Sequence, residues 1–465
     1  MLTSRRHVIK SLGAAALAST ALTAIPRTFT AHAANTTGYK ALVCVFFFGG
    51  LDCHDLILPY DQSSYDQYAQ LRASLLAQQG SARERASLSP LSPATGGVLQ
   101  GRQVALPPEM PLLEGLFRGG KAAIVGNVGP LIEPTTRASF EGGAVRLPPR
   151  LFSHNDQQAV WQANQPEGAQ YGWGGLFADA VLASGANASL PQFTTITTED
   201  VGPFLTGRRA VPYRVSTAGA ARVDFLEDYY DGLSGERAEL LEAVRNQLSA
   251  ASYRGDHLLE RDMATAFSGG LATNEAYDLA RQQGASLPTS FPATPLAAQL
   301  RAVAETINVR DRLFASRQIF FVGLGGFDTH DGQARALPAL LSQIDGALSA
   351  FQTAMETLGL DRDVTLFTAS DFGRTLAVNG DGTDHGWGGH QIVLGGAVKG
   401  GEIYGALPPP VLGHDADSGG GRLIPFVAVD NYAAELGRWF GLSESELSAA
   451  LPGLGNFDPL PTSFV

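Results

Sequence analysis

The residues best suited to chemistry in this chain are carboxylates and imidazoles that follow apolar runs of sequence. Asp52 comes shortly after one such run, and Asp371 comes two positions after another. Asp328 and His330 come shortly after a third. Mixed Asp and His sets suit Zn²⁺, Mn²⁺ or Fe, and two such ions can clamp the attacking and leaving oxygens of an ester. The pattern therefore predicts a metal site that acts on an ester.

A glycine-rich segment, Asp384-His385-Gly-Trp-Gly-Gly-His390, adds two histidines five residues apart. Such a spacing in a glycine-rich loop implies that the backbone, rather than one face of a helix, positions the side chains. We expect His385 and His390 to join the metal site.

The other clusters also have purely structural interpretations. Asp52 follows Gly49-Gly50 and could build a turn. Asp328 could cap a helix, with His330 on the surface beside it, and Asp371 could cap the turn after its own segment. Because four clusters follow the same pattern, we favour the functional interpretation.

The elements that must position these residues are apolar segments rich in β-formers, which predict buried strands. The clearest ones are Tyr39–Phe48, Ala122–Val128, Gln318–Val322, Val364–Ala369 and Gln391–Leu394. Shorter strands are expected at 193–198, 210–215 and 426–429. Helices are expected near 64–78, 111–117, 153–164, 173–182, 236–250, 295–308, 334–358, 432–440 and 443–449.

Strands that alternate with helices predict an α/β fold, a three-layer α/β/α sandwich with a mainly parallel central sheet. We expect one domain over 34–465, with a helical insertion around 220–310. Ligands of open α/β sheets bind outside the carboxyl ends of the strands, where the polar clusters lie.

Residues 1–33 have the features of a twin-arginine export signal. Arg5-Arg6 precedes a mild apolar run from Leu12 to Ile25, and Ala31-His32-Ala33 supplies a small-x-small cleavage site. We therefore expect a periplasmic or secreted protein, exported already folded.

Net charge, apolar stretches and cysteine content bear on nucleic-acid binding, membrane insertion and disulfide formation. The net charge is −12, and removal of a signal with four basic and no acidic residues leaves the mature chain near −16. Such a chain is a poor nucleic-acid binder. No second apolar stretch is long enough to span a bilayer. The chain has two cysteines, Cys44 and Cys53, which could form a disulfide after export or stay free.

Several segments resemble the exported domain-of-unknown-function family DUF1501, which is grouped with the alkaline phosphatase-like superfamily. They are Gly49-Gly50-Leu-Asp52, 151–157 (LFSHNDQ), Gly172-Trp-Gly-Gly, 326–330 (GFDTH) and 370–375 (SDFGRT). The resemblance covers nearly the whole mature chain.

The resemblance implies an alkaline phosphatase-like fold with one or two divalent metal ions at the carboxyl edge of the sheet. It implies that Asp52 and Asp371 hold one ion, although Phe372 stands where a histidine is usual. His385 would replace that histidine. Asp328, His330 and His390 would hold the other ion.

The resemblance also implies a nucleophile at a helix N-terminus. Ser153 is the first candidate, although it could simply cap the helix that follows it. Thr135 or Thr136 is the second. Arg374 is expected to bind the phosphate or sulfate through its planar guanidinium.

Two functional hypotheses follow. The first is an exported metal-dependent hydrolase of phosphate or sulfate esters, acting on a small-molecule or polymer substrate. The second is a non-catalytic periplasmic relative that acts in the cell envelope through an exported partner protein.

Overall fold

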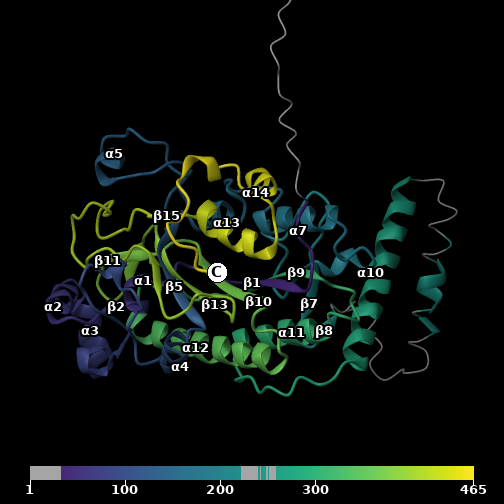
Figure 1. Ribbon diagram of the computed structural model, residues 1–465, viewed down its shortest axis with the longest axis horizontal. Coiled ribbons are helices and arrows are strands. Elements are labelled where there is room, and N and C mark those ends of the chain that lie inside the picture. The colour runs from purple at the N-terminus through teal and green to yellow at the C-terminus, as the bar shows by residue number, and fades with distance from the viewer. Residues whose placement is uncertain (1–32, 221–238, 241, 248–249, 251–257) are drawn as a thin grey trace, which may run out of the picture. The chain divides into compact units, whose positions relative to one another are not determined.

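A ten-stranded sheet lies at the centre of the computed structural model (Figure 1), which describes residues 33–220, 239–240, 242–247, 250 and 258–465. The strand order is β14-β5-β13-β10-β1-β9-β6-β7-β8, and β15 also pairs with β5. The strands are β1 Lys40–Phe47, β5 Ala122–Gly129, β6 Thr195–Thr197, β7 Tyr213–Ser216, β8 Gly219–Ala220, β9 Arg317–Leu324, β10 Val364–Ser370, β13 Gly389–Leu394, β14 Ile403–Gly405 and β15 Val427–Ala428.

Most neighbouring strands of this sheet are parallel. β1 pairs in parallel with β10 and β9, β6 with β9 and β7, and β5 with β14 and β15. β13 is antiparallel to β10 and β5, and β8 is antiparallel to β7. The predicted α/β class with a mainly parallel sheet is confirmed.

Helices cover both faces of the sheet (Figure 1). One face carries α4 Pro111–Arg118, α11 Pro295–Asn308 and α12 Gln333–Thr357. The other carries α7 Trp173–Ala183, α13 Val429–Phe440 and α14 Glu444–Ala450. α6 His154–Ala163 contacts both α7 and β10.

The central strand β1 explains why two cores form. Ala41, Val43 and Val45 alternate into the core shared with α11 and α12. Leu42 and Cys44 point to the opposite core, shared with α7 and α13. Since strand side chains alternate between faces, a continuous apolar run is what a strand covered on both sides requires.

Shorter elements lie beside the sheet. Two small sheets are formed by β11 Arg374–Val378 with β12 Thr383–His385, and by β2 Leu58–Pro59, β4 Val104–Leu106 and β3 Ser89–Pro90. Further α-helices are α1 Cys53–Leu56, α2 Gln62–Leu71, α3 Ala73–Gln79, α5 Arg137–Glu141 and α10 Leu258–Gln283, and the described residues 239–240, 242–247 and 250 are also helical.

Some sequence predictions fall on residues outside the described chain. The predicted signal at 1–33 lies outside it except for Ala33, and so does part of the predicted helix at 236–250. The described part of the predicted insertion contains α10 and α11. Cys44 and Cys53 are both buried and free, so no disulfide joins them. A search of the described helices finds none with the length and apolarity needed to cross a membrane.

Candidate metal centre

Residues from three of the predicted clusters, Asp328, Asp371 and His385, lie close together near the carboxyl ends of β9 and β10. Asp371 directly follows β10, and Asp328 lies in the loop between β9 and α12. Gly49 has a φ of +112°, and a Cβ there would lie 2.4 Å from the backbone nitrogen of Asp328. Glycine therefore lets the end of β1 approach the loop that carries Asp328.

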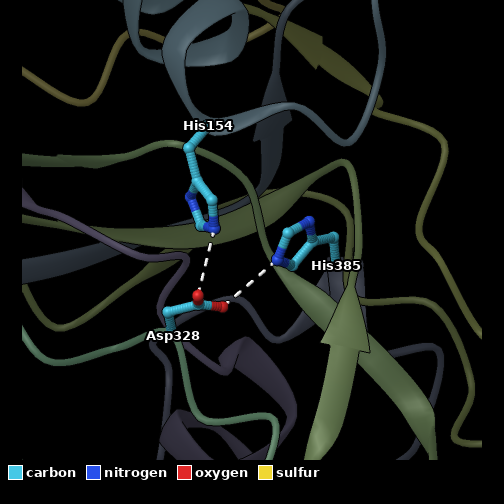
Figure 2. A group of neighbouring side chains, drawn as sticks. All are labelled: His154, Asp328 and His385. Atoms are coloured by element: carbon cyan, nitrogen blue, oxygen red, sulfur yellow. Dashed lines mark hydrogen bonds and ion pairs between the residues drawn. The ribbon is translucent and has the colours of Figure 1, made fainter.

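The Asp328 carboxylate is the centre of the cluster. Its Oδ1 lies 3.1 Å from His385 Nε2 and 3.2 Å from His330 Nε2, and it accepts a hydrogen bond of 2.9 Å from Arg374 Nη1. Its Oδ2 lies 3.4 Å from His154 Nε2. Figure 2 shows the His154 and His385 rings both directed at this carboxylate.

His154 is the first residue of α6, and a contact with Asp371 determines which of its ring nitrogens carries the proton. Its Nδ1 lies 2.6 Å from Asp371 Oδ2. Because an ionised carboxylate only accepts hydrogen bonds, Nδ1 is the donor, and in the neutral ring Nε2 carries the free lone pair. This Nε2 is buried and has no hydrogen-bond partner among the described residues. A carboxylate behind a histidine in this way is the usual support of a metal-binding imidazole.

His385 is fixed in the same tautomer by a backbone carbonyl. Its Nδ1 lies 2.7 Å from the carbonyl oxygen of Phe152, which can only accept. Phe152 has a φ of +74°, a conformation that bulky residues rarely adopt. Such strained backbone persists where the surrounding structure enforces it, and here it aims the carbonyl at His385.

Two imidazole lone pairs therefore converge with one carboxylate. The ligand atoms of His154, Asp328 and His385 all lie within 4.8 Å of one another. Acceptors that face acceptors require a proton or a cation between them. With bonds of about 2.0–2.1 Å, neighbouring ligand atoms of a tetrahedral Zn²⁺ site lie about 3.3 Å apart. The distances from His385 Nε2 to Asp328 Oδ1, 3.1 Å, and from His154 Nε2 to Asp328 Oδ2, 3.4 Å, are of this size, each to a different oxygen of the carboxylate. The residues present fit a divalent ion such as Zn²⁺, Mn²⁺ or Fe.

His330 lies at the open side of this group. Its Nε2 is 2.8 Å from His385 Nε2, and its Nδ1 is 3.4 Å from Asp384 Oδ1. The His330 and Asp328 side chains are 44% and 47% exposed, so solvent reaches the centre from this side. His330 can thus serve as a further ligand or as a hydrogen-bonding group.

Asp371 supports the centre from the buried side. Its side chain has no exposed surface, and its Oδ2 also accepts a 2.9 Å hydrogen bond from Gln158 Nε2. Its Oδ1 is buried with no hydrogen-bond partner in the described chain. Asp371, predicted as a direct ligand, lies behind His154 and orients its ring.

Arg374 is buried and engaged with protein groups. It donates to Asp328 Oδ1, to the Gly49 carbonyl at 3.2 Å, and to the hydroxyl and carbonyl of Thr383. With no exposed surface on its side chain, it holds the Asp328 carboxylate in place. This position favours a positioning role over the predicted contact with a substrate anion.

The pKa shifts follow from these contacts. The hydrogen bond to Asp371 raises the pKa of His154, whereas burial lowers the pKa of His385. Burial alone would raise the pKa of Asp328, but the hydrogen bond from Arg374 and the neighbouring imidazoles outweigh it, and this pKa is lowered. The carboxylate therefore stays ionised, as a metal ligand must.

Asp52 is not brought together with this group. It is fully buried, its oxygens accept hydrogen bonds from Arg72 Nη1 at 2.5 Å and Nη2 at 3.1 Å, and it caps α1 through the backbone nitrogen of His54. Gln333 Nε2 donates to the same carboxylate at 2.5 Å. The structure gives Asp52 a buried ion pair with Arg72 in place of the predicted metal contact.

His390 is also placed apart from the centre. It lies in β13, and its Nδ1 accepts a 3.0 Å hydrogen bond from the backbone nitrogen of Asn127. Burial and the nearby His54 lower its pKa to about 3. A ring nitrogen that accepts from the backbone belongs to the architecture of the sheet rather than to the predicted ligand set.

The predicted nucleophiles have structural partners. Ser153 is the N-cap residue of α6, and its Oγ donates to Asp156 Oδ2 at 3.0 Å. Thr136 caps α5 in a capping box with Ser139, and Thr135 Oγ1 donates to the Glu133 carbonyl.

His154 was not among the predicted ligands, although the segment 151–157 is one of those that resemble the family. The available signal was the Ser153-His154 pair at the start of a helix, where a side chain can reach the edge of the sheet. Asp371 lies 217 residues away.

Solved structures similar to this chain include a sulfatase, a lipoteichoic acid synthase and an alkaline phosphatase mutant. One is the PsFucS1 sulfatase from Pseudoalteromonas sp., with 9% identity, 92% of this chain and 71% of that one covered, and a TM-score of 0.36. Another is the lipoteichoic acid synthase LtaP from Listeria monocytogenes, with 8% identity, 91% and 94% covered, and a TM-score of 0.28. A mutant of alkaline phosphatase PafA has 10% identity, 73% and 64% covered, and a TM-score of 0.26. TM-scores this low carry no argument about chemistry.

No curated protein matches this chain. A family model described as a protein of unknown function, DUF1501, matches residues 39–418, which is most of the sequence. The chain therefore belongs to the DUF1501 family.

Proposed function

We propose that this protein is a metal-dependent hydrolase of phosphate or sulfate esters. The observation that carries the proposal is the pair of imidazole lone pairs, on His154 and His385, that converge on the Asp328 carboxylate. Both tautomers are fixed by acceptors behind the rings, so the two Nε2 atoms are prepared for a cation before it binds.

A divalent ion held by these three residues would supply Lewis-acid chemistry and activate water at neutral pH. The protein groups around it have defined tasks. Asp371 holds the proton on His154 Nδ1, the Phe152 carbonyl holds the proton on His385 Nδ1, and Arg374 fixes the carboxylate. His330, half exposed beside them, is placed to donate a hydrogen bond or a proton to an incoming oxygen.

The test is hydrolysis of a panel containing a phosphate monoester, a phosphate diester and a sulfate ester, by the purified protein loaded with Zn²⁺ or Mn²⁺. We expect turnover of at least one class, abolished by His385→Ala and retained in Asp331→Asn. Asp331 is an exposed carboxylate in the loop that carries Asp328 and His330, and it serves as the control. Failure to turn over any class in the metal-loaded protein would contradict the hydrolase proposal.

The alternative is a non-catalytic metal-binding protein that acts through an exported partner in the cell envelope. Two contacts favour it: the Ser153 hydroxyl is engaged with Asp156, and Arg374 is buried among protein acceptors. A metal-loaded protein that is inert toward the panel but whose His385→Ala variant loses function in cells would support this alternative. Export by the twin-arginine route to the periplasm remains part of both proposals.

A further inference from the structure

A cavity of about 450 Å³ lies beside the candidate metal centre. Its size is within the range of small-molecule sites, about 300–1,000 Å³. It is formed by one face of α6, by Phe48 at the end of β1, and by the segment 199–203 that follows β6. These are the carboxyl ends of parallel strands, the usual place for ligands in such sheets.

α6 connects this cavity to the metal centre. His154 at its first position faces Asp328, and Asn155, Gln158 and Gln162 line the cavity from the same helix. Residues spaced by three and four positions lie on one helix face, which explains the row of amides. Gln158 contributes to both places, because its Nε2 donates to Asp371 while its side chain lines the cavity.

The charge of the lining excludes an anionic occupant. Glu167, Glu199 and Asp200 line the cavity, and no Lys, Arg or His is among its lining residues. Asp200 pairs with Arg214 at 3.1 Å, whereas Glu167 and Glu199 form no salt bridge within the described chain. An anionic phosphate or sulfate group belongs at the metal centre, and the cavity suits the part of the substrate that carries no negative charge.

Because the lining combines carboxylates with amides, it favours an uncharged hydroxylated occupant over a cationic one. Hydroxyl groups both donate and accept, and the free amide groups can match them. Gln158 keeps its oxygen and one N–H, because its other N–H donates to Asp371, and Gln162 keeps its NH₂ group, because its oxygen accepts from the backbone nitrogen of Phe204. An ammonium group only donates, so it would use the carboxylates but leave the amide N–H groups of the lining without an acceptor. The Phe48 side chain adds an apolar surface at the end of β1.

We propose that this cavity is the leaving-group subsite of the proposed hydrolase and that it takes a neutral polyhydroxylated group, such as a sugar ring. Only the assignment of the cavity as a leaving-group subsite rests on the proposed function. The binding of the hydroxylated group itself depends on residues outside the metal set.

The test is therefore a binding measurement on the chelator-treated full-length protein. The probes are the methyl glycosides of glucose, galactose, mannose and N-acetylglucosamine, with choline as the cationic probe and gluconate as the anionic one. Saturation-transfer NMR and calorimetric titration are the readouts. We expect one or more glycosides to bind and gluconate not to bind.

The variant Asn155→Ala removes an exposed amide from the lining without disturbing the core. Loss of one uncharged hydrogen bond should raise the Kd of the glycoside about threefold to tenfold. The matched control Glu260→Gln, on the exposed start of α10, should leave the Kd unchanged. Choline binding without glycoside binding, or no binding by any glycoside, would overturn the inference.

The two proposals fail separately in this design. Glycoside binding by a protein that hydrolyses no ester would leave the subsite standing and refute the hydrolase. Ester hydrolysis by a protein that binds none of the glycosides would refute the subsite alone.

Discussion

The support of His154 by Asp371 leads to a quantitative prediction. The Asp371 side chain is wholly buried and its Oδ2 lies 2.6 Å from His154 Nδ1, so water cannot replace it. Substitutions of such supporting carboxylates typically cost about 10-fold to 100-fold in metal affinity, or about 1.4–2.7 kcal/mol. Asp371→Asn should fall near the tenfold end, because Gln158 Nε2 donates to Oδ2 and favours an oxygen at that position.

The assay is competition for Zn²⁺ between the protein and a chromophoric chelator. Asp331→Asn, in the loop after His330, is the control and should bind as tightly as the unmodified protein. Circular dichroism in the presence of a chelator shows whether each variant is folded before metal is added. A folded Asp371→Asn variant whose affinity stays within about twofold of the control would refute the reasoning that Asp371 orients the ligand.

Two further predictions concern the buried Arg72–Asp52 ion pair and the two histidines, His54 and His390, whose pKa values are lowered. Arg72→Met should lower the free energy of unfolding by about 3–5 kcal/mol, because it leaves Asp52 buried without its cation, and adding Asp52→Asn should recover much of the loss in urea unfolding. Burial lowers the pKa of His54 to about 4 and that of His390 to about 3, so the unfolded chain binds protons first as pH falls below about 6.5. Stability should therefore fall as the pH falls through this window. Between pH 5.5 and 4.5, His54→Gln should reduce the slope by about 1.2 kcal/mol per pH unit; an unchanged slope would contradict burial of a neutral His54.

The sheet was predictable because its strands are covered on both faces. Runs such as Val364–Ala369 have no charged residue and only threonines as polar ones, and the structure has β10 at 364–370. The direction of β13 was not predictable, because hydrophobic content does not distinguish parallel from antiparallel strands. The predicted helix at 64–78 is divided at Arg72, whose side chain is buried to pair with Asp52.

The positions of the strand ends in the sequence predicted where the site lies, but they did not predict the direction in which each side chain points. Asp328 and His385 are brought together as their positions suggested. Asp52 and His390 lie after or within strands too, yet each is turned toward an internal partner, Arg72 and the Asn127 backbone respectively. The spacing of neighbouring residues does not predict such hydrogen-bond partners, since they come from segments that are distant in sequence or from the backbone itself.

The central claim is that His154, Asp328 and His385 bind a divalent ion, and metal content tests it most directly. Elemental mass spectrometry of the purified protein, loaded with Zn²⁺ and then desalted, should find about one ion per chain, the number expected for one set of three ligands. The His154→Ala, His385→Ala double variant should retain almost none, while Asp331→Asn retains the ion. A folded protein that keeps no ion, or a double variant that keeps as much as the unmodified chain, would contradict the claim.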